Sequence, residues 1–297
     1  MQAFFSYNDR IKTILEDTTM KVSVIQMNMR SLESKANFDR AEALVRRAVA
    51  ENGPDVVVLP ETWNTGFMPA GDLAALERQL DAEDCSAVLV EIVQGEGGVR
   101  ALDADYLKAV EALCHEKNVL FCVDEVQTGN GRTGTWFTYE QFGLSPDLVS
   151  TAKGLGNGLP IGATLMGSKT AEVLTPGTHG STFGGNPVAC AGALSVLEQI
   201  DDAFLEAVKQ KGAWLTAELE KIPGVKDVSG LGLMLGFSVE GCKSADIKAK
   251  ALDNGLVVLT AKDRVRLLPP LAITEEELSD GLLRLAAAIR EVQEAAH

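Results

Sequence analysis

Apolar and polar positions follow clear periods over most of the chain, and they predict alternating strands and helices. Residues 119–123 form a continuous apolar run long enough for one buried strand, and residues 87–92 predict another. Between them, residues 103–117 carry apolar side chains at helical spacing, with Leu107 and Leu113 on the same face. A helix that joins two buried strands is typical of a βαβ unit, so we expect these strands to be parallel.

Similar patterns continue towards the C-terminus. Further strands are expected at 148–149, 163–166, 230–239, 255–259 and 265–268, and further helices at 72–80, 188–200, 204–222 and 245–252, with a last helix ending near residue 293. Asn186 followed by Pro187 is typical of a helix start, and Thr274 with Glu277 has the spacing of a capping box. The chain is therefore predicted to be an α/β protein with a mostly parallel sheet and a smaller C-terminal α/β domain.

The first seventy residues have a pattern of their own. Residues 20–28 alternate like a strand, residues 36–50 have helical spacing, and residues 55–59 form a second apolar run. Ile11 and Ile14 are spaced for one helical turn. Almost all of the net charge lies after residue 70, so we expect a boundary there. The expected domains are a leader at 1–70, a partial large domain at 71–200 and a small domain at 201–297.

Composition narrows the class of protein. The chain is 46% apolar and 23% charged, which is typical of a globular protein with a sizeable core. Its net charge of −15 disfavours nucleic acids and anionic membranes as partners. The five cysteines are scattered without a CxxC pair, which indicates reduced thiols of a cytoplasmic protein and no zinc site. No apolar run reaches the length of a membrane span, and no signal peptide is indicated.

Candidate chemistry lies at the ends of two predicted strands. Asp124 and Glu125 follow the run 119–123, and Lys153 follows the shorter run 148–149 among several glycines. Ligands of open α/β sheets bind outside the carboxyl ends of the strands. A lysine amine can link covalently to the aldehyde of pyridoxal phosphate, and a carboxylate can keep the ring nitrogen protonated. The residue types alone also allow a buried ion pair or an exposed lysine in a loop.

Three sequence blocks make the cofactor interpretation more specific. They read VDEVQTGNGRTG, STAKGLGNGLPIGA and HGSTFGGNPVACAGA, and they resemble the signature blocks of class III pyridoxal-phosphate aminotransferases, in particular the acetylornithine aminotransferase branch. The resemblance runs from about residue 71 to the C-terminus. It implies a truncated fold-type-I aminotransferase, because the family's glycine-rich phosphate loop, ring-stacking aromatic residue and second substrate arginine have no counterpart in residues 1–70.

The same resemblance implies roles for individual residues. Lys153 would carry pyridoxal phosphate and move the proton between substrate and cofactor. The remaining cofactor-binding residues would be Asp124 at the ring nitrogen, Val126 on the ring face, Gln127 at the ring hydroxyl, Thr182 at the phosphate, and Glu125, which orients its neighbours. The substrate-binding residues would be Glu96, Ser181 and Arg266, with Arg266 binding the substrate carboxylate through its guanidinium fork and pairing with Glu96.

The implied reaction transfers a terminal amino group from an acetylornithine- or ornithine-like donor to 2-oxoglutarate. In this family the loop with Ser181 and Thr182 reaches across a dimer interface, so the resemblance also implies a homodimer. An alternative is a catalytically inactive fragment that acts only by associating with an intact subunit.

Two other motifs favour different classes of protein. The block MKVSVIQMN…PDVVVLPETWNTGFMP resembles the start of the nitrilase superfamily of carbon–nitrogen hydrolases, in which Glu61 would be the general base. That family's lysine block and nucleophilic cysteine have no match downstream, which disfavours this chemistry. Glycines 129, 131 and 134 spell G-x-G-x-x-G. The aromatic, interrupted segment after them does not predict the helix that a dinucleotide site requires.

Overall fold

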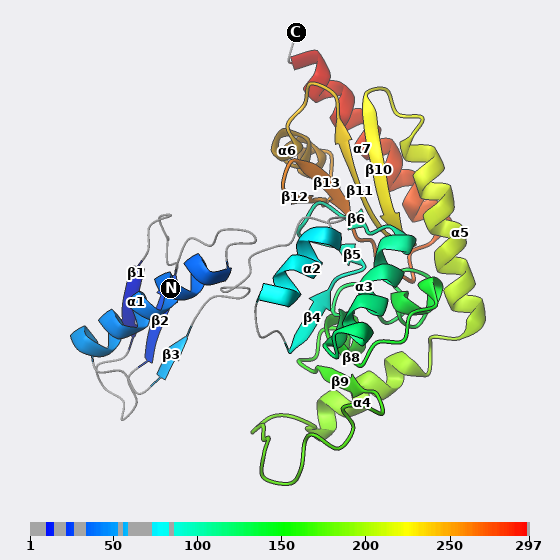
Figure 1. The fold of residues 1–297 in the computed structure, drawn as a ribbon. Helices are drawn as coiled ribbons and strands as arrows, with labels where there is room; N and C mark the ends of the chain where they lie inside the picture. Colours follow the sequence, from blue (N-terminus) through cyan, green and yellow to red (C-terminus); the bar gives the residue numbers. More distant parts are fainter. Residues whose placement is uncertain are drawn as a thin grey trace. The chain divides into compact units, whose positions relative to one another are not determined.

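The computed structural model describes residues 10–14, 22–26, 34–52, 56–58, 73–82 and 86–295. The chain divides into two compact units, residues 1–70 and 71–297 (Figure 1). Glu61 and Asp72 lie outside the described residues, so the proposed hydrolase base and the expected start of the helix at 72–80 stay predictions.

The first unit contains a three-stranded sheet in the order β1-β2-β3. Strand β1 (Arg10–Ile14) is antiparallel to β2 (Val22–Gln26), which is parallel to β3 (Val56–Val58). Helix α1 (Ser34–Asn52) lies between β2 and β3 in the sequence, as its pattern predicts. The helical turn expected at Ile11 is wrong. One isolated turn has few hydrogen bonds of its own, whereas pairing with β2 satisfies the backbone groups along β1.

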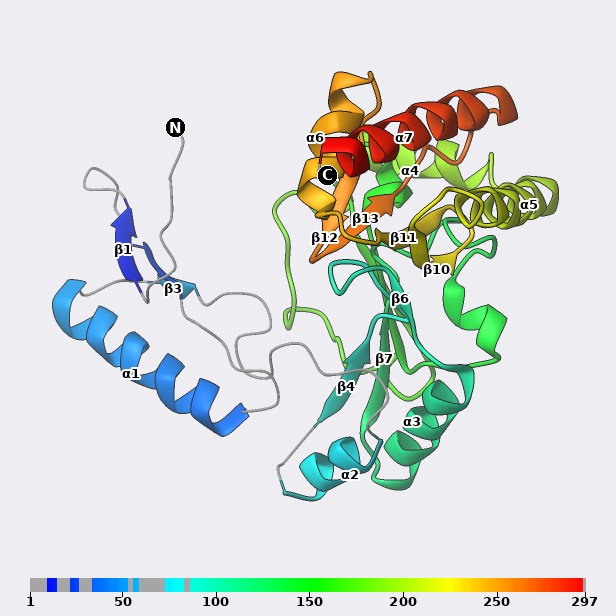
Figure 2. The ribbon, with the colours of Figure 1, turned by 90° about the horizontal axis from the view of Figure 1, so that it is seen from above.

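The second unit contains a four-stranded sheet in the order β4-β7-β8-β9. The strands are β4 (Ala87–Val90), β7 (Leu120–Asp124), β8 (Leu148–Thr151) and β9 (Ala163–Met166). The first three pair in parallel and β9 is antiparallel to β8, so the mostly parallel sheet is confirmed. Helices α2 (Leu73–Ala82) and α3 (Ala104–Glu116) lie beside β4 and β7 (Figure 2).

Helix α3 makes the crossover that the sequence predicts between β4 and β7. It begins at Asp103, whose carboxylate accepts the backbone N–H groups of Asp105 at 2.9 Å and Tyr106 at 3.0 Å. Such capping satisfies N–H groups that have no partner inside the helix. The apolar face of α3 is buried, at Leu107, Val110, Leu113 and Cys114.

An antiparallel sheet in the order β10-β11-β13-β12 forms the C-terminal part of the second unit. Its strands are β10 (Val225–Leu231), β11 (Met234–Val239), β12 (Leu259–Ala261) and β13 (Arg264–Leu267). Its helices are α5 (Asp202–Leu219), α6 (Ser244–Asp253) and α7 (Glu275–Ala295), which pack with the sheet around one apolar core (Figure 1). The expected capping box is present, because Thr274 and Glu277 exchange side-chain and backbone hydrogen bonds.

Two expected strands of this part are corrected. Residues 230–239 form a hairpin rather than one strand, because Gly230 (φ 124°) and Gly232 (φ 54°) reverse the chain between β10 and β11. A Cβ at Gly230 would lie 2.0 Å from the Met234 carbonyl oxygen, so only glycine fits the reversal. The strand expected at 255–259 begins only at Leu259, because Gly255 (φ 76°) follows the end of α6 and leads into a turn.

The connecting segments carry most of the candidate chemistry. A small hairpin, β5 (Val93–Gln94) with β6 (Arg100–Ala101), holds the QGEGG sequence. The glycines at 129–134 lead into turns and the short 3-10 helix η1 (Thr138–Phe142). They are therefore not followed by the α-helix that a dinucleotide site requires. Lys153 begins a second 3-10 helix, η2 (Lys153–Gly156), and helix α4 (Pro187–Leu197) begins at Asn186 as expected.

A close helix–turn contact in the C-terminal part yields a stability prediction. Gly212 on α5 packs directly against Gly232, and a Cβ at Gly212 would lie 2.3 Å from the Gly232 carbonyl oxygen. We expect Gly212→Ala to lower the free energy of unfolding by about 1–3 kcal/mol, because the turn must shift to accept a methyl group. Urea unfolding followed by circular dichroism measures the difference.

Gly281 on α7 is the matched control. Its added Cβ would meet only Leu256 Cδ1 at 3.6 Å, an ordinary contact. Gly281→Ala should therefore stabilise the helix by roughly 0.5–1 kcal/mol. Equal effects of the two substitutions would contradict the assigned contact.

Candidate functional site

Strand register brings three polar positions to one edge of the parallel sheet. Val90 of β4 pairs with Val123 of β7, and Asp124 of β7 pairs with Ser150 of β8. Glu91 is the first residue after β4, so it lies at the same edge of the sheet as Asp124. Lys153 begins η2 two residues after β8 ends. This edge is the carboxyl end of the parallel strands, where ligands of such sheets bind.

Asp124 is held in place by groups from two strands. Its Oδ1 accepts the backbone N–H of Val126 at 2.8 Å and the Ser150 hydroxyl at 3.2 Å. Both donors fix the orientation of the carboxylate. Sequence patterns did not single out Ser150, although its place directly after the apolar pair 148–149 is a usable signal.

Glu91 is a candidate residue that the sequence analysis missed. Burial and the nearby Asp124 carboxylate raise the pKa of Glu91 to about 7, against the opposing influence of the Gly95 backbone N–H and the Lys153 amine. Glu91 thus interacts electrostatically with both Asp124 and Lys153, and the strand register places it at the same edge of the sheet as Asp124. The sequence feature that could have indicated Glu91 is a carboxylate at the end of an apolar strand, shortly before the QGEGG sequence.

The structure brings Glu96 and Arg266 together, as the sequence resemblance implies. Arg266 Nη1 lies 2.6 Å from Glu96 Oε1. Arg266 projects from β13, with 9% of its side chain exposed, whereas 60% of the Glu96 side chain is exposed. The arginine is therefore fixed within the fold and needs a partner for its buried charge, whereas the glutamate carboxylate is largely solvated.

Gln127 lies against the loop that carries Glu96. A Cβ at Gly95 would come within 2.6 Å of Gln127 Oε1, so the absence of a side chain at Gly95 is what allows the approach. Val126 and Gln127 are both half-buried, in the turn after β7. Val126 and Gln127 are expected at the ring face and the ring hydroxyl of the cofactor. They therefore lie next to Asp124 at one edge of the sheet.

Glu125 makes its contacts within the following loop. It is fully buried, and its carboxylate accepts the Thr128 hydroxyl and, at 2.9 Å, the backbone N–H of Tyr139. Burial raises the pKa of Glu125, while these hydrogen bonds lower it. These contacts order the segment 128–139, so the carboxylate orients neighbouring backbone, the role expected of it.

Arg132 connects that loop to the C-terminal sheet. Its Nη1 donates to the carbonyl oxygens of Leu233 at 3.1 Å and Pro269 at 2.6 Å. The backbone N–H of Leu233 returns a hydrogen bond to the Arg132 carbonyl at 3.0 Å. Burial lowers the pKa of Arg132 to about 10. Because Pro269 lies on the segment just after β13, these bonds link the Asp124 loop to the element that carries Arg266.

Ser181 and Thr182 lie on an exposed loop before α4. Ser181 Oγ accepts the backbone N–H of Gly184 at 2.9 Å, within the same loop. Phe183 beside them is 81% exposed. Within this chain, no described hydrogen bond brings either hydroxyl to Lys153 or Asp124.

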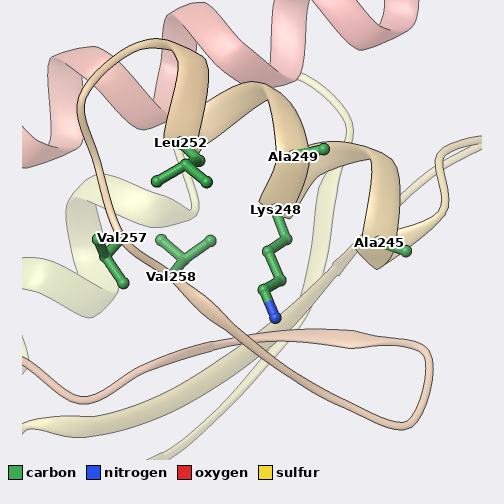
Figure 3. A pocket seen from close by; sticks show the side chains of 6 residues that line it. All are labelled: Ala245, Lys248, Ala249, Leu252, Val257 and Val258. Atoms are coloured by element: carbon green, nitrogen blue, oxygen red, sulfur yellow. The ribbon is translucent and has the colours of Figure 1, made fainter. Parts of the chain in front are cut away.

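A pocket lies on α6, and its lining does not include the residues described above. It encloses about 350 Å³ and is lined by Ala245, Lys248, Ala249, Leu252, Val257 and Val258 (Figure 3). None of the candidate site residues lines it.

Among the described residues, no group of three His, Cys, Asp or Glu side chains is arranged to hold a metal ion. No helix in the described part of the chain is long and apolar enough to cross a membrane.

Fold and site together define an α/β protein with a ligand position at the carboxyl edge of a parallel sheet. The family model for class III aminotransferases matches residues 17–289. The chain therefore belongs to the class III aminotransferases, a family that depends on pyridoxal phosphate. The match begins well before residue 71, where the signature-based resemblance starts.

Individual relatives agree with this family. The chain is 49% identical over 234 residues to acetylornithine aminotransferase of Haemophilus ducreyi, covering 78% of this chain and 60% of that protein. It is 46% identical over 228 residues to the Bacillus subtilis enzyme of the same name, covering 75% and 59%. The chain thus spans about three fifths of the length of the curated relatives that it matches.

Solved structures show the same fold. N-acetylornithine aminotransferase from Stenotrophomonas maltophilia superposes with a TM-score of 0.72 at 33% identity, covering 88% of this chain and 74% of that one. Plasmodium falciparum ornithine delta-aminotransferase gives a TM-score of 0.69 at 33% identity, covering 90% and 73%.

The raised pKa of Glu91 makes stability depend on pH. The folded-state pKa of about 7 exceeds the ordinary value of 4.5, so the folded state binds this proton more tightly than the unfolded state. That contribution is fully present below the ordinary pKa and is lost as the pH rises through 7. Glu91→Gln stays uncharged, so its stability relative to the wild type should increase between about pH 5 and about pH 8.

Urea unfolding at the two pH values tests this expectation. Glu116→Gln, at an exposed position on α3, is the matched control. If the difference in the free energy of unfolding between Glu91→Gln and the wild type is the same at both pH values, Glu91 does not interact with these charges.

Proposed function

We propose that this chain binds pyridoxal phosphate and contributes to transamination between an acetylornithine- or ornithine-like amine donor and 2-oxoglutarate. The observation that carries the proposal is the strand register, which brings Asp124 to the carboxyl edge of the sheet, with Lys153 starting η2 just after the neighbouring strand β8. A carboxylate and an amine around one position suit the two ends of a pyridine aldehyde. The names of the relatives support the choice of the amine donor.

The residues present fit the cofactor. Gly95 leaves room for the side chain of Gln127. A side chain at Gly95 would fill the space that the Gln127 amide occupies. Lys153 would hold the cofactor through its aldehyde and Asp124 would face the ring nitrogen, while Val126 and Gln127 would contact the ring and its hydroxyl. When bound, pyridoxal phosphate supplies an electron sink for the carbon that loses a proton.

The chain's own residues then have defined tasks. The Lys153 amine accepts a proton from the substrate carbon and returns it during the exchange of the amino group. Asp124, oriented by the Val126 N–H and the Ser150 hydroxyl, would accept a hydrogen bond from the ring nitrogen of the cofactor. Glu125 holds the following loop in place.

Arg266 and Glu96 account for the use of two different substrates. With the pair closed, Glu96 neutralises Arg266, and the position suits an amine donor. With the pair open, the guanidinium can bind the α-carboxylate of 2-oxoglutarate as a fork. The exposure of Glu96 favours such opening, because a solvated carboxylate needs no new partner.

A second copy of the chain would complete the site. Ser181 and Thr182 lie on an exposed loop, where their hydroxyls are available to a neighbouring subunit. Helix α4 after this loop carries the exposed apolar side chains Val188, at 70%, and Leu194, at 57%. Exposed apolar area of this kind typically marks an interface. The proposal is therefore a cytoplasmic homodimer in which residues 71–200 form the cofactor domain and residues 201–297 the small domain.

A second candidate is a catalytically inactive fragment that associates with an intact subunit. It is favoured by apolar side chains on both edge strands of the parallel sheet, Leu89 of β4 at 65% exposure and Leu165 of β9 at 45%. Edge strands with such side chains tend to pair with further chain. Co-purification with a full-length aminotransferase, without turnover by this chain alone, would select this candidate.

Substituting the lysine tests cofactor binding directly. The purified protein is mixed with pyridoxal phosphate, reduced with borohydride, digested and analysed by mass spectrometry. We expect the cofactor on the peptide containing Lys153, and we expect Lys153→Ala to lose both this label and the visible absorbance of the bound cofactor. Lys169→Ala, at an exposed lysine, should keep both. A label elsewhere in the wild type, with none on Lys153, would refute the assignment.

Arg266 gives a test of substrate choice. Arg266→Lys keeps the charge but loses the fork, so we expect the KM for 2-oxoglutarate to rise about ten- to a hundredfold. Glu96→Gln should lower that KM, because the competing carboxylate is gone, and should raise the KM for the amine donor. Steady-state kinetics for both substrates measure the two effects, with Arg290→Lys on α7 as an exposed control. Unchanged KM values in Arg266→Lys would remove it from the substrate site.

A further inference from the structure

Lys153 has an unfavourable backbone conformation. Its φ is 42°, in the left-handed region that residues with a Cβ rarely adopt. Such a conformation costs about 1–2 kcal/mol and persists only where surrounding groups hold it. The segment around Lys153 must therefore be fixed by other parts of the fold.

Asn130 supplies contacts on both sides of this position. Its Nδ2 donates to Thr151 Oγ1 at 2.9 Å and to the Ala152 carbonyl oxygen at 3.4 Å. On the other side of Lys153, an added Cβ at Gly154 would lie 3.5 Å from Asn130 Cβ, so Gly154 passes directly beside the asparagine. One side chain thus hydrogen-bonds the two residues before Lys153 and lies close to the residue after it.

The surroundings of Asn130 make these contacts rigid. Asn130 is 4% exposed and Thr151 is 4% exposed, so water does not compete for the amide. Asn130 itself has a φ of 57°, which asparagine tolerates better than most residues. The Ala152 carbonyl also accepts the backbone N–H of Leu155 at 2.9 Å, which starts the turn of η2.

We infer that Asn130 is a positioning residue for Lys153, whose buried amide holds residues 151 and 152 so that Lys153 keeps its left-handed conformation at the end of β8. The asparagine belongs to the loop ordered by Glu125, whereas the lysine belongs to the segment after the next strand. The hydrogen bonds of Asn130 therefore couple the loop after Asp124 to the lysine. The consequence for cofactor capture rests on the proposed function, whereas the backbone role does not.

Hydrogen–deuterium exchange tests the backbone role without a cofactor. Asn130→Gly keeps the left-handed conformation accessible and removes only the side chain. We expect exchange at the Leu155 N–H to accelerate about two- to tenfold, the factor that corresponds to the loss of a hydrogen bond. Thr151→Val, which removes the acceptor instead, should show the same direction of change. Asn118→Gly, at another left-handed asparagine (φ 55°) that is exposed, should leave this exchange unchanged.

The rate of borohydride-fixed labelling of Lys153 by pyridoxal phosphate provides the second readout. We expect Asn130→Gly to slow this labelling about two- to tenfold while Asn118→Gly labels at the wild-type rate. Unchanged exchange at Leu155 in both Asn130→Gly and Thr151→Val overturns the positioning role. A wild-type chain that is never labelled at Lys153 refutes the proposed function instead, and the exchange data still decide the role of Asn130.

Discussion

The parallel pairing of β4, β7 and β8 is the constraint on which the whole site depends. Backbone hydrogen bonds fix Val90 beside Val123 and Asp124 beside Ser150. Side chains that are far apart in the sequence therefore reach the same edge of the sheet. A shift of one residue in the β4–β7 pairing would separate Asp124 from Glu91, and a shift in the β7–β8 pairing would separate it from Ser150. The apolar residues of these strands thus determine where the polar chemistry lies.

Loops tied to the C-terminal sheet complete the arrangement. The hairpin with QGEGG packs against that sheet through the apolar cluster Val93, Val99 and Met234, and the Ser229 hydroxyl donates to the Val99 carbonyl at 2.6 Å. Arg132 makes the second connection, to carbonyl oxygens near β13. The loops after β4 and β7 are therefore both held at the C-terminal sheet, of which the Arg266 strand is a part.

Much of this arrangement could be predicted from the sequence. Strand and helix periods gave most of the helices and strands in residues 86–295, and the resemblance to class III aminotransferases led to Asp124, Lys153 and the Glu96–Arg266 contact, which the structure contains. The errors were local. The reversal at Gly230 and Gly232 was read as one strand, because a tight turn between apolar residues leaves the alternating pattern almost intact. The positions of Ser181 and Thr182 relative to Lys153 could not be predicted within one chain.

The sequence by itself determined which elements form and which residue types stand at their ends, because periodicity and capping are properties of neighbouring residues. Only the tertiary structure decided which of those residues act together. The pKa of Glu91 depends on Asp124 and Lys153, which come from two other segments, and the contacts of Asn130 join a loop to a segment beyond the next strand. Burial and strand register create these relations, and both exist only when distant parts of the chain are packed against each other.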